Sequence, residues 1–191
     1  MPPTLLTVVL NWRTAEMTLR AVEAALRAME GMAGALTIVD NASGDGSFEA
    51  LSAAVKARGW ETGAVPVRLL QSGHNGGFGA GNNLGIRAGL PDGRRPDYIY
   101  ILNSDAFPGP GAIRALLDHL EAHPETGFAG SHIRGEDGTP HRTAFRFPSI
   151  ASELEGAARL GPISRALRQR IVAQPIPEAT SRVDWLAGAS L

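Results

Sequence analysis

Strand-sized apolar runs alternate with amphipathic helical segments through the first two thirds of this 191-residue chain. The run at residues 5–10 (LLTVVL) is continuously apolar and partly β-branched, which is typical of a strand buried on both faces. The segment after it carries an apolar helical stripe that includes Leu19, Val22 and Leu26. Strands joined by helices at this spacing pair in parallel, with right-handed crossovers. We therefore predict an α/β fold in three layers (α/β/α) with a mostly parallel sheet, its strands at residues 5–10, 36–39, 65–70 and 98–102.

The regular alternation stops at about residue 132. The regular part ends with a fifth, short strand predicted at residues 128–131. Beyond it we predict a hairpin turn at 135–139, arginine-bearing helical pieces after Pro148 and a strand at 183–185. No internal repeat or low-complexity linker divides the chain. The sequence therefore predicts a single domain over residues 1–191, with a regular core at 1–131 and a less regular region at 132–191.

Composition narrows the classes of protein to which the chain can belong. Its 18 basic and 19 acidic side chains give a net charge of −1, which disfavours a protein that binds nucleic acid by neutralising many phosphates. The absence of cysteine excludes disulfides, thiolate zinc sites and thiol nucleophiles. The longest apolar runs fall far below the roughly 20 residues that a membrane-spanning helix needs. We expect a cytoplasmic protein that binds no nucleic acid.

Three of the four predicted core strands end in polar or glycine-rich segments, at residues 40–46, 72–83 and 103–105. The carboxyl ends of parallel strands meet at one edge of a sheet, and open α/β sheets bind their ligands there. The three segments are therefore expected to form one site. This prediction comes from the topology and needs no single motif.

The first of these segments offers two carboxylates. Asp40 follows directly on a buried strand, so we expect a fixed carboxylate that accepts hydrogen bonds from a heterocycle or a sugar hydroxyl. Asp45 and Ser47 are interpreted first as helix-capping residues.

The glycine-rich segment contains HNGGFGAGNN at residues 74–83. Its glycines allow close backbone approach to a ligand, and a helix N-terminus after them favours phosphate. It is not a dinucleotide-binding fingerprint, because Asn82 and Leu84 occupy the required third glycine positions. Taken alone, the segment is equally well explained as a tight turn between a strand and a helix.

The third segment ends in Asp105. A carboxylate at a strand end, opposite a loop that favours phosphate, suits a hard divalent cation that bridges protein and diphosphate. The alternative is a turn or capping residue before Pro108. His119 and His123 lie one helical turn apart without a third ligand pattern, so we interpret them as part of a solvated face.

Arginines follow at positions 159, 165, 168 and 170, among apolar residues. This pattern allows a basic amphipathic patch for a membrane surface, but Gly161 and Pro162 interrupt it and favour an ordinary surface helix.

In series, these segments resemble the family 2 glycosyltransferases, which have the GT-A nucleotide-diphospho-sugar transferase fold, a Rossmann-like arrangement. The rhamnosyltransferase-like branch is the most similar, and the resemblance runs from Thr4 to Leu191. It is carried by VVLN at residues 8–11, VDNASGDG at 39–46, NGGFGAGNNLG at 75–85, LNSD at 102–105, RFPS at 146–149 and DWLAGA at 184–189.

The resemblance implies transfer of a sugar, with inversion, from a nucleotide-diphosphate donor such as dTDP-rhamnose or a UDP-sugar. The acceptor would be a hydroxyl of a glycan or lipid-linked glycan in polysaccharide synthesis, at the inner face of the cell membrane and with peripheral membrane association. Residues 1–131 would be the donor-binding core, and 132–191 the start of the acceptor-side region.

The family's roles carry over to matching positions. Asp40 would contact the nucleotide base, and Asp105 would hold Mn²⁺ or Mg²⁺ at the family's D-x-D position, where Asn103 replaces the first aspartate. Arg13 stands where an asparagine is common. The remaining donor-site residues are expected to be Leu10, Asn11, Asn41, Ser43, Asp45, Asn75, Gly76, Gly77, Asn82, Asn103 and Ser104.

No catalytic base is assigned. The resemblance places the family's base some tens of residues after a segment like 184–189, so the fold is expected to be incomplete at its C-terminus. Glu136 and Asp137 match a hairpin turn instead.

Two other functions stay open: a nucleotide-sugar binding module without catalysis, and a sugar-phosphate nucleotidyltransferase. The latter usually has a glycine-rich basic loop after the first strand, where this chain reads NWRT at residues 11–14.

Overall fold

The computed structural model describes residues 2–158, 165 and 167–191. The chain forms two compact units, of which the first comprises Met1–Ala129 and Gly188–Leu191 and the second comprises Gly130–Ala187. Each unit is described by itself.

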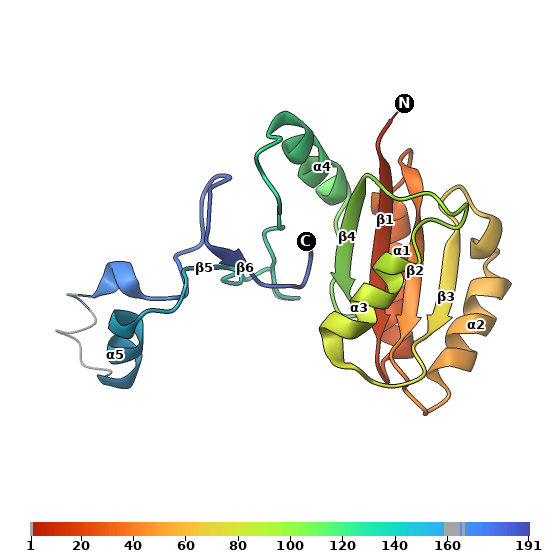
Figure 1. The fold of residues 1–191 in the computed structure, drawn as a ribbon, viewed down its shortest axis with the longest axis horizontal. Coiled ribbons are helices and arrows are strands. Elements are labelled where there is room, and N and C mark those ends of the chain that lie inside the picture. Colours follow the sequence, from red (N-terminus) through yellow and green to blue (C-terminus); the bar gives the residue numbers. More distant parts are fainter. Residues whose placement is uncertain (1, 159–164, 166) are drawn as a thin grey trace. The chain divides into compact units, whose positions relative to one another are not determined.

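A parallel four-stranded sheet forms the centre of the first unit (Figure 1). Its strands are β1 (Thr4–Asn11), β2 (Ala33–Asp40), β3 (Val67–Gln71) and β4 (Tyr98–Asn103). Their order is β3-β2-β1-β4, so each central strand is covered on both edges. The long apolar runs therefore lie in β1 and β2, where side chains on both faces are buried.

Helices cover both faces of this sheet, which confirms the predicted three-layer architecture. One core packs α1 (Ala15–Ala28), α2 (Ser47–Ala57) and α4 (Ala112–Ala122) against one face. The other face is covered by α3 (Gly77–Arg87), which contributes Leu84 and Ile86 to a smaller second core. A short 3-10 helix, η1 (Trp60–Thr62), lies between α2 and β3.

Glycines let α3 lie close to the sheet. A Cβ atom on Gly85 would be 2.7 Å from Val8 and 3.1 Å from Val39, and one on Gly81 would be 2.3 Å from Leu10. The glycine-rich sequence therefore has a packing role over β1 and β2, beside any contact with a ligand.

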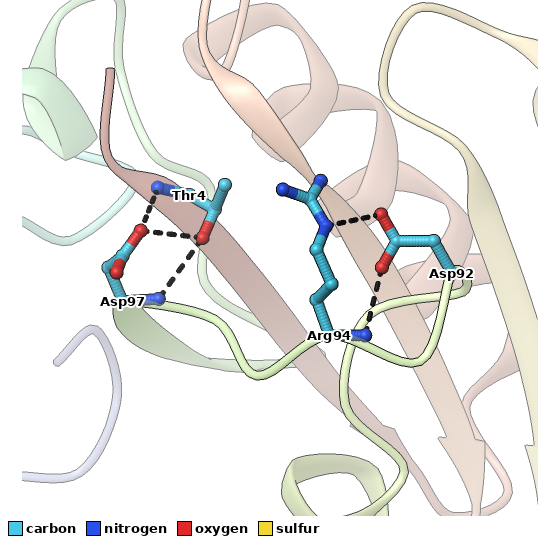
Figure 2. A network of polar contacts seen from close by, with 4 residues as sticks. All are labelled: Thr4, Asp92, Arg94 and Asp97. Atoms are coloured by element: carbon cyan, nitrogen blue, oxygen red, sulfur yellow. Dashed lines mark hydrogen bonds and ion pairs between the residues drawn. The ribbon is translucent and has the colours of Figure 1, made fainter. Parts of the chain in front are cut away.

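The amino ends of β1 and β4 are fastened to each other by side chains (Figure 2). The Asp97 carboxylate accepts hydrogen bonds from the backbone N–H (2.8 Å) and the hydroxyl (2.7 Å) of Thr4. These bonds stabilise the ionised form and hold the pKa of Asp97 below its ordinary value. Nearby, Arg94 pairs with Asp92 through Nε at 2.7 Å.

A partly buried arginine binds the carbonyls at the end of α3. Arg68 of β3 donates through Nη2 to the carbonyl of Gly89 (2.6 Å) and through Nη1 to that of Ala88 (3.4 Å). These carbonyls follow the last turn of the helix, where a cation is favourable. Burial lowers the pKa of the guanidinium.

The end of the chain extends the sheet beyond β4. Ile101 and Leu191 exchange both backbone hydrogen bonds, and Ser190 forms an antiparallel bridge with Leu102. The Ser190 hydroxyl also lies 2.6 Å from the buried Tyr100 hydroxyl, and burial raises the pKa of that tyrosine. The two residues that follow the DWLAGA segment, Ser190 and Leu191, therefore pair with β4.

The second unit contains a two-stranded antiparallel sheet of β5 (Ala144–Phe145) and β6 (Trp185–Leu186). It also contains α5 (Ile150–Ala158) and the 3-10 helix η2 (Arg168–Arg170). The predicted turn at residues 135–139 is confirmed, because the Gly135 N–H donates to the Thr139 carbonyl. The arginine and apolar positions at 159, 160 and 163 lie outside the described residues.

Two predicted strands differ from the structure. The strand predicted at residues 128–131 is wrong: this segment is irregular, and Phe128 is 81% exposed. A segment as short as FAGS, with a single large apolar side chain, makes a strand only where a neighbouring strand pairs with it. The strand predicted at 183–185 begins two residues later, at Trp185, where pairing with β5 starts.

In the part of the chain that the structure describes, no helix is long and apolar enough to span a bilayer.

We predict that Gly85→Ala lowers the free energy of unfolding by about 1–3 kcal/mol, because the new methyl group would overlap Val8 and Val39. Gly79→Ala provides the matched control in the same helix, since a Cβ there meets nothing within 4 Å. Urea unfolding of both variants is the measurement. Equal stability of the two variants would contradict the close packing of α3.

Candidate functional site

The register of β1 and β2 places Asn11 beside Asp40 at the carboxyl edge of the sheet. The Asn11 carboxamide nitrogen donates to Asp40 Oδ1 at 2.7 Å. Ser43 donates to the same carboxylate twice, through its backbone N–H (3.2 Å, to Oδ2) and through its hydroxyl. Asn11 and Asp40 are both 0% exposed, so the Asp40 side chain is buried with hydrogen-bond donors on both of its oxygens.

This arrangement gives Asp40 a structural part in the site. Its carboxylate fixes the turn after β2, in which Ala42 adopts a left-handed conformation with φ of 55°. The expected contact between Asp40 and a nucleotide base stays a prediction. A ligand that reaches this carboxylate has to share it with Asn11 and Ser43.

Hydroxyl groups connect the loop after β1 with the loop after β4. Asn11 Oδ1 accepts a hydrogen bond of 2.7 Å from the Thr18 hydroxyl. The Thr14 hydroxyl lies 3.4 Å from the same oxygen and 3.3 Å from the Ser104 hydroxyl. The segment of residues 103–105 is thereby tied to the Asn11–Asp40–Ser43 network.

Asn41 connects the turn after β2 with the glycine-rich loop. Its carboxamide nitrogen donates to Asn75 Oδ1 (2.9 Å) and to the Gly77 carbonyl (3.3 Å). Asn75 Oδ1 also accepts the Gly77 N–H at 2.9 Å. The structure therefore brings together all three predicted segments, as the topology required.

The glycine-rich loop leads directly into α3, as predicted. The N-cap residue Gly76 has no side chain, and Asn75 Oδ1 accepts the N–H of Gly77, the first helical residue. Residues 75–80 are all exposed to solvent. An exposed helix N-terminus presents backbone N–H groups and the positive end of the helix dipole, an arrangement that binds phosphate.

Three asparagine oxygens at this edge are buried without a hydrogen-bond partner. They are Oδ1 of Asn41, Asn82 and Asn103; among the described residues, the other buried side-chain atom in this condition is Arg68 Nε. Asn41 and Asn82 are each only 3% exposed. A buried carbonyl oxygen without a donor is unfavourable, so these three are candidate positions for a hydrogen bond from a ligand or for coordination to a cation.

The residues at the end of β4 suit a hard cation. Asp105 is an exposed carboxylate two positions after Asn103, whose side-chain oxygen Oδ1 has no partner. Carboxylate and amide oxygens are the ligands that Mg²⁺ and Mn²⁺ prefer. Within the described residues, no three His, Asp or Glu side chains gather into a metal-binding group. The rings of His119, on α4, and His123, its C-cap residue, stack 4.2 Å apart; His119 is half-buried and His123 is exposed.

Two expected site residues have local structural roles. The Asp45 carboxylate accepts the N–H of Ser47, the first residue of α2, at 3.0 Å. The N-cap position itself is occupied by Gly46, without a side-chain cap, so the prediction that Asp45 and Ser47 are N-cap residues is wrong. The hydrogen bonds from Ser47 hold the pKa of Asp45 below its ordinary value. The Leu10 side chain packs beneath α3 in the second core.

Residues 12–14 follow Asn11 directly but were not among the predicted site residues. Trp12 is exposed beside the site, with the Arg13 guanidinium 5.1 Å from the ring centre. Arg13 has a positive φ of 58° and donates to Ser43 through its backbone N–H (2.9 Å) and through Nε (3.1 Å). The sequence does contain a signal for these residues: a tryptophan and an arginine follow directly after a buried strand, where the loops of the predicted site begin.

Comparison with known proteins assigns a family. A sequence model described as "Glycosyl transferase family 2" matches residues 6–180. N-acetylglucosaminyl-diphospho-decaprenol L-rhamnosyltransferases from two strains of Mycobacterium tuberculosis are each 35% identical over 141 residues. That match covers 65% of this chain and 43% of each relative, so the chain spans less than half the length of these curated proteins.

Solved structures confirm the fold. The mannosyltransferase PcManGT from Pyrobaculum calidifontis, in complex with GDP-Man and Mn²⁺, superposes with a TM-score of 0.54 at 15% identity, covering 71% of this chain and 36% of that protein. S. aureus TarS 1-349 superposes with a TM-score of 0.51 at 15% identity, covering 79% and 43%. The predicted GT-A α/β fold is therefore correct.

We predict that Asp40→Asn lowers the free energy of unfolding by about 1–3 kcal/mol even without ligand. The NH₂ of the new amide would face the groups of Asn11 and Ser43 that now donate hydrogen bonds to Asp40. The control is Asp45→Asn, at an exposed carboxylate, which should change the free energy of unfolding by no more than about 0.5 kcal/mol. Chemical denaturation measures both. An Asp40→Asn protein as stable as the parent would contradict a structural role for this network.

Proposed function

The chain belongs to glycosyl transferase family 2, and from this premise we propose that it binds a nucleotide-diphosphate sugar at the carboxyl edge of the first unit's sheet. The donor sugar would pass to a hydroxyl group of an acceptor. The observation that carries the proposal is the set of unpartnered oxygens of Asn41, Asn82 and Asn103. Sugar hydroxyls, ribose hydroxyls and the N–H of a pyrimidine base are donors of the kind these oxygens lack.

The diphosphate is assigned to the N-terminus of α3. The exposed backbone of Asn75, Gly76 and Gly77 supports this placement, because no side chain blocks its approach. The Asp105 carboxylate, together with the side-chain oxygen Oδ1 of Asn103, would hold Mn²⁺ or Mg²⁺. A divalent cation bound there supplies charge stabilisation to the leaving diphosphate.

The nucleoside is assigned to the side of the site formed by residues 11–14 and the Asp40 turn. The exposed Trp12 ring offers a face on which a base can stack. Asp40 and Asn11 keep this side in place through their mutual hydrogen bond. Ser104 lies on the opposite, β4 side, linked through Thr14.

The donor and acceptor are proposed from the relatives. The Mycobacterium tuberculosis proteins are named as rhamnosyltransferases acting on a diphospho-decaprenol-linked sugar. We therefore assign dTDP-rhamnose, or a related UDP-sugar, as donor and a glycan or lipid-linked glycan as acceptor. This chemistry fits polysaccharide synthesis at the cytoplasmic face of the cell membrane.

Titration calorimetry with dTDP, dTDP-rhamnose and UDP-sugars, with and without Mn²⁺, tests the proposal. Binding that Mn²⁺ strengthens supports the donor site. If no nucleotide binds at any metal concentration, the proposal fails. Radiolabelled sugar transfer to a lipid-linked acceptor then separates an enzyme from a binding module without catalysis.

We predict that Asp105→Ala loses the metal-dependent part of the nucleotide affinity, by at least about tenfold, which is the loss typical even of outer-shell metal partners. Because Asp105 is exposed, the melting temperature should not change. Asp118→Ala, at an exposed carboxylate on α4, is the control and should bind like the parent. Unaltered Mn²⁺ dependence in Asp105→Ala would count against the assigned metal ligand.

A further inference from the structure

The outer edge of β3 is open. This strand stands at one end of the order β3-β2-β1-β4, and Figure 1 shows it (yellow) as the outermost strand on its side of the sheet. The Leu36 N–H donates to the Pro66 carbonyl, which sets the even-numbered residues of β3 toward β2. The backbone N–H and C=O groups of Val67, Leu69 and Gln71 therefore point away from β2. Among the described residues, none of these groups has a hydrogen-bond partner.

Val67 distinguishes this edge from an ordinary solvated one. The residue is only 3% exposed, so its outward N–H and C=O groups are shielded from solvent as well as unpaired. Buried backbone groups without a partner are rare and unfavourable. Many edge strands are protected by a charge or a proline, but none of the three outward residues is charged or is a proline. An added strand would therefore gain hydrogen bonds at this edge.

A groove with a volume of about 330 Å³ lies at the same edge. Helix α2 packs against β3 and forms one wall of the groove. The lining residues are Phe48, Ser52 and Val55 of α2, Glu61 of η1, residues 66–69 at the strand, and Pro91 after α3. None of them is among the predicted donor-site residues, so the groove is distinct from the site at the carboxyl edge.

Arg68 gives the groove a cationic donor without a partner. Its terminal nitrogens bind the Ala88 and Gly89 carbonyls and the Thr37 hydroxyl, whereas its Nε is buried and unpartnered. The acceptor that a guanidinium N–H binds most strongly is a carboxylate. Because side chains alternate along a strand, Arg68 lies on the face of the sheet opposite to Val67. A strand beside β3 would thus meet apolar side chains on one face and a cation on the other.

We propose that the β3 edge binds an extended segment of another protein, in which apolar residues alternate with acidic ones, as an added strand. The backbone of that segment would pair with the outward groups of Val67 and Leu69. Its apolar side chains would lie beside Phe48 and Val55, and its carboxylate beside Arg68. The inference is independent of the proposed function, because it uses no residue of the donor site.

Charge complementarity favours this partner over a second copy of β3. Antiparallel pairing of two copies about Leu69 would make the two Arg68 side chains diagonal neighbours on one face of the sheet. Parallel pairing in register would set them side by side. Like charges in these positions are destabilising, whereas an acidic segment supplies the opposite charge.

A labelled, end-blocked peptide of sequence VEVEV is the probe, since its alternation fits β3 in either strand direction. Fluorescence anisotropy should show saturable binding to the whole chain. The peptide VKVKV should bind at least about tenfold more weakly, because a hydrogen bond to a charged group contributes that much or more. No saturable binding of VEVEV, or equal binding of the two peptides, overturns the proposal.

Substitutions outside the strand locate the peptide. Ser52→Phe fills the groove from an exposed position of α2 and should weaken VEVEV binding by about tenfold or more, because it blocks the pairing. Ala53→Phe is the matched control, at the next exposed position of the helix and outside the groove lining, and should bind like the parent. Glu61→Gln should strengthen binding, since it removes a carboxylate that repels the peptide. Equal affinity of the two phenylalanine variants contradicts the assigned groove.

The backbone pairing has a test of its own. Residue-resolved amide exchange should slow at Leu69 when VEVEV is bound, and it should not change at Arg68, which already pairs with β2. N-methylation of the valines should abolish binding if the peptide is antiparallel to β3, and N-methylation of the glutamates if it is parallel. Loss of binding with both modified peptides, or with neither, overturns strand addition.

Sedimentation of the chain without peptide distinguishes the other occupant. The chain should show no self-association that Ser52→Phe abolishes and Ala53→Phe preserves. A dimer with that behaviour would make a second copy the occupant of the groove and would overturn the proposal.

Discussion

The parallel pairing of β1 with β2 is the constraint on which the rest of the candidate site depends. It sets Asn11 directly beside Asp40 in a region with no exposure to solvent. A buried carboxylate is tolerated only when donors surround it, and here the donors come from Asn11 and Ser43. The turn after β2 is thereby fixed, and the polar segments that follow the other strands are arranged around it.

From this centre, single hydrogen bonds reach the other loops. Asn41 continues the turn and holds the glycine-rich loop through Asn75, while Thr14 reaches Ser104 after β4. Asp40 acts through its hydrogen-bonded neighbours, and the unpartnered asparagine oxygens remain for a ligand. Asp40 therefore positions the loops of the site, and the side-chain oxygens of the asparagines provide the acceptors that a ligand can use.

The core fold could be predicted from the sequence because buried parallel strands are long, apolar and evenly spaced, as in residues 5–10 and 36–39. The convergence of the three polar segments followed from that topology. The burial of Asp40 could not be predicted, since it depends on the register that brings Asn11 to it. Nor could residues 128–131 be distinguished from a strand, because a short apolar run forms one only where a partner pairs with it.

The measurement that tests the account most directly is amide hydrogen exchange with dTDP and Mn²⁺. The account predicts slower exchange in residues 40–46, 72–83 and 103–105 together, because one ligand would contact all three segments. Residues 86–96, at the amino edge of the sheet, should exchange as they do without ligand. Slowing confined to residues 86–96 or to the second unit, or no slowing at saturating nucleotide, would contradict a nucleotide-sugar site at the carboxyl edge.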